Sequence, residues 1–78
     1  MSDWERRLEA AEAGAERLEA AEHEAEQRFK ALHADAQARG DGEAALQSDE
    51  FHSWMATRHQ TDAAWGAWAT LMDEKQAG

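Results

Sequence analysis

Apolar residues recur with a heptad spacing from the N-terminus to Arg39, and this repeat constrains the fold more than any other feature of the chain. With Trp4 placed at heptad position d, the a and d positions are filled almost entirely by apolar side chains: Leu8, Ala15, Phe29 and Ala36 at a, and Ala11, Leu18, Ala25 and Leu32 at d. Such spacing aligns one narrow apolar stripe along a long helix. Because the stripe is largely alanine, it cannot stabilise a lone helix in water, so the sequence predicts a helix that packs against another.

Capping signals set the bounds of this helix. Ser2 and Glu5 have the S-x-x-E spacing of a capping box, which predicts a start at the N-terminus. Arg39 suits the negative end of the helix dipole, and Gly40 can take the left-handed conformation that follows a last turn. We therefore expect a first helix over about 3–38.

A hinge follows, over 39–48, and then a second helix. The stretch 40–42 reads Gly-Asp-Gly and favours a turn. Residues 43–47 can form a short helical turn that packs Leu46. Ser48, followed by Asp49 and Glu50, has the composition of a helix N-terminus, so we expect the second helix over about 49–75.

The second helix carries a wider and more mixed stripe. Its a and d positions hold large apolar side chains at both ends and polar ones in the middle: Phe51, Trp54, Arg58, Thr61, Trp65, Trp68 and Met72. Met55 and Leu71 widen this stripe on opposite flanks. A stripe that extends beyond a and d can contact more than one neighbour, which is typical of a four-helix bundle.

These patterns predict an all-α antiparallel helical hairpin that forms one domain, 1–78. The simplest pairing brings Ala36 near Phe51. It also leaves the first turns of the longer helix overhanging, so that Trp4 and Leu8 have no partner within the chain. With 78 residues and no cysteine, the chain cannot gain stability from a large core or a disulfide. We therefore expect a homodimer in which two hairpins form a four-helix bundle.

Charge narrows the range of partners. Seventeen acidic residues against eight basic ones give a formal net charge of −9. This sign disfavours direct contact with nucleic acid or an anionic membrane and allows a further protein partner that is basic. The acidic N-terminus is unlike a secretory signal, and no run approaches the ~18 apolar residues of a membrane span, so we expect a cytoplasmic protein. The scarcity of residues with AT-rich codons suggests a bacterial or phage source.

Two polar residues at a positions, Glu22 and Arg58, are the strongest candidates for a buried site. We interpret them as a structural pair that fixes helix register, within the chain or between copies, rather than as an acid, a base or a metal ligand. His52 and His59 fall on the outer face, and the chain contains no Glu-x-x-His motif. Surface histidines are therefore favoured over a metal site.

The remaining candidates are interface residues, because no catalytic or cofactor motif is present. Tryptophan and arginine are enriched at binding hot spots, although helical spacing also favours a core role. The predicted protein interface consists of Trp4, Leu8, Trp54, Arg58, Trp65, Trp68 and Met72. We expect a non-enzymatic adaptor or regulatory inhibitor without a cofactor. An acidic mimic of DNA and a metal- or ligand-binding bundle are the alternatives.

Overall fold

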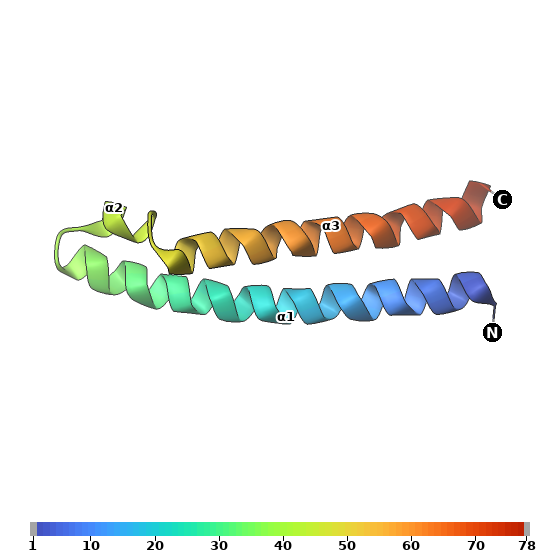
Figure 1. Cartoon of the computed structure of the whole chain (residues 1–78), viewed down its shortest axis with the longest axis horizontal. Helices are drawn as coiled ribbons and strands as arrows, with labels where there is room; N and C mark the ends of the chain where they lie inside the picture. The colour runs from blue at the N-terminus through green and yellow to red at the C-terminus, as the bar shows by residue number, and fades with distance from the viewer. Residues whose placement is uncertain (1, 78) are drawn as a thin grey trace.

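The chain folds into a helical hairpin, as the sequence predicted. A computed structural model describes residues 2–77, with side chains through Lys75. It contains α1 (Asp3–Ala38), the short helix α2 (Gly42–Ala45) and α3 (Asp49–Ala77). The two long helices lie antiparallel and side by side, so the start of α1 and the end of α3 lie at the same end of the molecule (Figure 1). The overall extents of 57 × 19 × 14 Å are those of a single layer of two helices.

The capping signals at the start and end of α1 act as expected. The backbone N–H of Glu5 donates to Ser2 Oγ over 3.1 Å. At the other end Gly40 has a φ of 80°, its N–H donates to the Gln37 carbonyl (2.9 Å), and the N–H of the next residue donates to the Ala36 carbonyl (2.8 Å). These two bonds form a Schellman motif, which requires a left-handed residue and so favours glycine at position 40.

The hinge is built around α2 and Ser48. Ser48 Oγ accepts from the Phe51 N–H (3.1 Å) and donates to the Ala45 carbonyl (2.6 Å), so this one hydroxyl joins the end of α2 to the start of α3. The expected helical turn is present, but the side chain that it buries differs from the prediction. Ala45 is 2% exposed, whereas Leu46 is 49% exposed. The prediction that Leu46 packs was therefore wrong, because α2 ends at Ala45 and turns that residue toward α1.

The largest buried cluster lies beside the hinge and centres on Phe29. The Phe29 ring lies 5.3 Å from Phe51 and 5.2 Å from Trp54 between centroids, and it stacks on His33 at 5.6 Å. Ala36 and Ala45 complete the buried cluster. Toward the open end the buried side chains are small or isolated: Ala15, Ala25, Thr61 and Leu71. The heptad stripe of α1 is confirmed, since each of its a and d residues from Trp4 to Ala36 is buried or half-buried.

The expected overhang of the first turns was wrong. Trp4 Nε1 donates to the Leu71 carbonyl over 2.7 Å, and the Lys75 ammonium lies 5.0 Å from the centre of the Trp4 ring. Leu8 is half-buried. The extra length of α1 instead lies at the hinge end, where α2 covers it (Figure 1). Support for a second copy must therefore come from other parts of the surface.

Candidate interaction surface

The helix α3 is rotated relative to the orientation that its a and d positions predicted. The side of α3 that faces α1 is formed by heptad positions d and g. Thr61 and Leu71 are buried there, and Ala64 is half-buried. Arg58, at position a, is exposed, so its predicted place in the seam was wrong. Glu22 is half-buried, and no ion pair joins Glu22 to Arg58 among the described side chains. A pair formed between two copies stays a prediction.

This rotation gives the hairpin two different open flanks. On one flank, position e of α1 adjoins position a of α3, as the hydrogen bond from Trp65 Nε1 to Glu19 Oε1 shows (2.8 Å). We call this flank the glutamate face. It is made of Glu5, Glu12, Glu19 and Glu26 on α1 and of Phe51, Met55, Arg58, Trp65 and Met72 on α3.

Charges on the glutamate face interact across the two helices. Lys30 Nζ lies 2.9 Å from Glu26 Oε1, and this hydrogen bond lowers the pKa of the Glu26 carboxyl below its ordinary value. Desolvation raises the pKa of this carboxyl, but the nearby charges of Lys30 and Arg58 lower it further, so the net shift is downward. Arg58 therefore acts on a carboxylate across the hairpin although it forms no direct ion pair among the described residues.

On the opposite flank, positions d and g of α1 adjoin positions g and c of α3. The ion pair between Arg7 and Glu74 crosses this flank at 3.7 Å. We call it the alanine face, because its middle is formed mainly by small side chains: Ala11, Gly14, Leu18, Ala21 and Ala25 on α1, and Ser53, Ala64 and Ala67 on α3.

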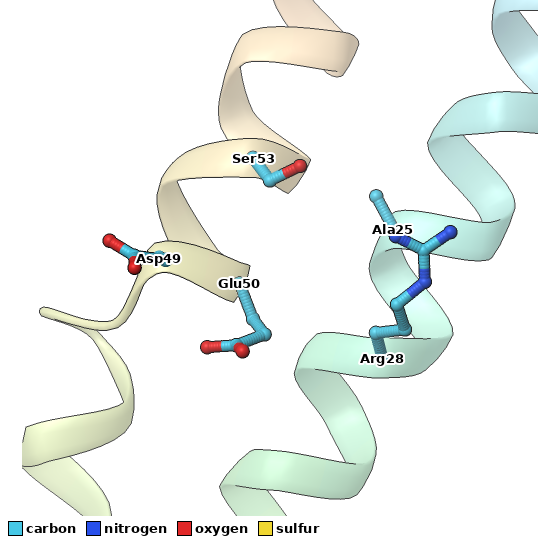
Figure 2. A pocket seen from close by; sticks show the side chains of 5 residues that line it. All are labelled: Ala25, Arg28, Asp49, Glu50 and Ser53. Atoms are coloured by element: carbon cyan, nitrogen blue, oxygen red, sulfur yellow. The ribbon is translucent and has the colours of Figure 1, made fainter.

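The small side chains leave a groove on the alanine face toward the hinge. Figure 2 shows Ala25 and Arg28 on α1 across from Glu50 and Ser53 on α3. Together with Asp49 they line a hollow of about 230 Å³. One rim of this hollow is basic and the other is acidic. Grooves between small residues are the places into which the ridges of another helix pack.

The predicted interface residues separate onto different parts of the hairpin. Arg58, Trp65 and Met72 lie on the glutamate face, whereas Trp4 closes the open end against Leu71. Trp54 and Trp68 lie half-buried in the seam, where their Nε1 atoms are buried without a hydrogen-bond partner among the described residues. The alanine face was missed, although small residues at position g of α1 could have indicated it.

The two histidines considered as metal ligands lie on the surface. His52 and His59 are exposed, and no group of three or more histidine, aspartate or glutamate side chains that could hold a metal ion gathers among residues 2–75. None of the described helices carries an apolar stretch long enough to cross a membrane. No known protein family, curated protein or solved structure matches the chain.

Proposed function

We propose that this chain is a non-enzymatic protein–protein interaction module, of the small adaptor or regulatory-inhibitor class, that acts as a homodimer. The main support for this proposal is the large surface area that the hairpin leaves exposed to solvent. The hairpin exposes 5524 Å², whereas a folded monomer of its mass exposes about 4,700 Å². The excess of roughly 800 Å² equals the area that one partner contributes to a standard protein interface.

The thinness of the hairpin supports the same proposal. A stable domain consists of at least two packed layers around one core. This hairpin is one layer, 14 Å along its shortest axis, and its described interior contains no fully buried large side chain. A second hairpin laid against the first supplies the missing layer and completes a four-helix bundle.

Charge favours the alanine face as the contact between copies. Along α1 this face carries Arg7, Arg28, Asp35 and Arg39, and along α3 it carries Glu50 and Glu74. Within the hairpin Arg7 pairs with Glu74 and Arg39 pairs with Asp35. In a two-fold pair that places α1 of one copy over α3 of the other, arginines meet carboxylates on both sides of the axis. The face is therefore self-complementary, although the chain as a whole has a net charge of −9.

Gly14, on the alanine face, is compatible with a close contact between helices. A glycine inside a helix costs about 0.5–1 kcal/mol relative to alanine. A Cβ placed on Gly14 would meet only Arg17 Nη2, at 3.9 Å, so nothing within the hairpin requires glycine there. The proposed contact gives this glycine a role, because the backbone of a second helix can approach it closely.

Sedimentation equilibrium tests the proposal. At micromolar concentration we expect a mass of about twice 8.7 kDa and a melting temperature that rises with protein concentration, because association stabilises only the folded chain. A mass of one chain, together with a cooperative melt that does not change with concentration, would contradict the dimer.

A matched glycine pair tests which face is used. Gly66 also lies within a helix with nothing near its Cβ position, but it lies outside the alanine face. Gly14→Gln and Gly66→Gln both raise helix propensity by about 0.5–1 kcal/mol. We expect Gly66→Gln to leave the dimer dissociation constant unchanged and Gly14→Gln to raise it at least about tenfold, which is about 1.4 kcal/mol. Equal dissociation constants for the two variants would exclude the alanine face.

A further inference from the structure

The glutamate face combines a row of carboxylates with a row of large apolar side chains. Glu5, Glu12, Glu19 and Glu26 follow one another at heptad spacing along α1. Beside them α3 presents four apolar side chains that remain only partly covered: Phe51, Met55, Trp65 and Met72. Apolar area bordered by one sign of charge is a typical feature of a surface that binds a protein partner.

The same face ends in a hollow next to the hinge. His33 continues the heptad row of Glu26, and it lines this hollow of about 390 Å³ together with Gln37, Gly42, Glu43 and Leu46. Leu46 is the one large hydrophobic side chain that is exposed among the described residues, and it stands at the rim of this hollow. The apolar part of the glutamate face therefore extends from Met72 near the open end to Leu46 at the hinge.

We propose that the glutamate face binds a basic amphipathic helix of a partner protein. The apolar side of that helix lies on the α3 row and on Leu46, and its lysines and arginines pair with the glutamates of α1. This is the helix-in-groove mode of recognition, in which anchors spaced by three and four residues fill one apolar groove. The inference rests on the proposed interaction function but does not depend on the dimer.

Charge decides against a second copy on this face. Lys30 is already engaged by Glu26, which leaves Arg58 as the other cation near the glutamate row. A second copy laid with α1 over α1 would bring its own glutamate row against the first, and juxtaposed like charges cost several kcal/mol. With α1 over α3, four glutamates would face Arg58 as the one cation on the α3 side of this face among the described residues. Nucleic acid and anionic lipid carry the same unfavourable sign. A cationic helix is attracted to the glutamate row, whereas these partners are repelled by it.

The orientation of the Trp65 ring is fixed before any partner binds. Its Nε1 donates to Glu19 Oε1, and its ring packs edge-on against Trp68 at 5.6 Å between centroids. A ring that is fixed before binding loses little conformational entropy when a partner covers it. Tryptophan in a preorganised site is the side chain most often found at binding hot spots.

Titration with two synthetic peptides tests the inference. The first peptide has about three heptads of leucine and lysine in amphipathic order. The second has the same length and lysine content, with serine in place of leucine. Isothermal titration of the full chain should give a dissociation constant at least about tenfold lower for the leucine–lysine peptide.

Two variants locate the binding site. Glu12 lies on the glutamate face and Glu24 on the far side of α1, where it pairs with Arg28 at 3.6 Å. Glu12→Lys should weaken binding of the leucine–lysine peptide at least about fivefold, whereas Glu24→Lys, with the same change of charge, should leave it within about twofold. Leu46→Ser, at an exposed position, should weaken binding several-fold without lowering the melting temperature.

Three results would overturn the inference. They are no binding of either peptide, equal effects of Glu12→Lys and Glu24→Lys, and equal affinity for the two peptides that disappears between about 0.05 and 0.5 M salt. The last result would indicate recognition by charge alone and would favour a mimic of DNA. Sedimentation of the same variants reports the dimer separately, so the two proposals fail independently.

Discussion

The hinge half and the open half of this hairpin are stabilised in different ways. Near the hinge, Phe29 packs against two aromatic rings, and two buried alanines close the cluster. Near the open end, Ala15 is 0% exposed, larger side chains such as Leu8 and Trp68 are only half-buried, and a hydrogen bond from Trp4 closes the terminus. The hinge half therefore has an aromatic core of its own, whereas the open half leaves most of its large apolar side chains only half-buried, which the proposed second hairpin would cover.

Phe29→Ala should break the hinge half and has the largest expected effect. It removes the ring that contacts Phe51, Trp54 and His33, and truncation of a buried aromatic residue costs about 3–5 kcal/mol. That loss is comparable to the whole stability of a small domain. We expect thermal melts followed by circular dichroism to show an unfolded or barely folded chain at 25 °C. A loss below about 1 kcal/mol would show that the cluster is not the core.

Trp4→Phe should loosen the open half alone. The substitution keeps a ring against α3 but removes the N–H that donates to the Leu71 carbonyl and weakens the contact with Lys75. We expect a loss of about 1 kcal/mol from the hydrogen bond. Hydrogen exchange should show faster opening in the first turns of α1, with unchanged protection around Phe29. Equal acceleration at both ends would contradict separate stabilisation of the two halves.

The Glu26–Lys30 pair, which lies on the surface of the hinge half beside Phe29, should have the smallest effect. Because the pKa of Glu26 is lower in the folded chain than in the unfolded chain, its contribution to stability is present above the unfolded pKa and is lost as pH falls through the folded pKa. Lys30→Gln should return the Glu26 pKa toward the ordinary glutamate value and flatten that part of the stability curve. An NMR titration of the Glu26 carboxyl measures the shift directly. An unchanged Glu26 pKa in Lys30→Gln would show that Lys30 does not lower it.

Local features of the sequence predicted local features of the fold. Ser2, Gly40 and Ser48 act within a few residues of themselves, so they marked the helix ends correctly. The heptad stripe of α1 was also predictable, since only one side of that helix is apolar.

The register and the rotation of α3 were not predictable from the same signals. The apolar residues of α3 occupy positions a, d, e and g, so several rotations bury similar area, and the choice among them depends on contacts with α1. The register depends on how α2 covers the hinge end of α1, which no local pattern specifies. These two errors placed Arg58 in the seam and Trp4 beyond it.

The central claim is that two hairpins associate through their alanine faces, and one pair of variants tests it most directly. Ala20 and Ala21 are adjacent, exposed and in the middle of α1, but Ala21 lies on the alanine face and Ala20 on the back of the helix. Sedimentation equilibrium of Ala20→Glu should give a mass of two chains at micromolar concentration, and that of Ala21→Glu should give a mass of one, because a carboxylate cannot be buried unpaired in that contact. Two dimeric variants, or two monomeric ones, would contradict the claim.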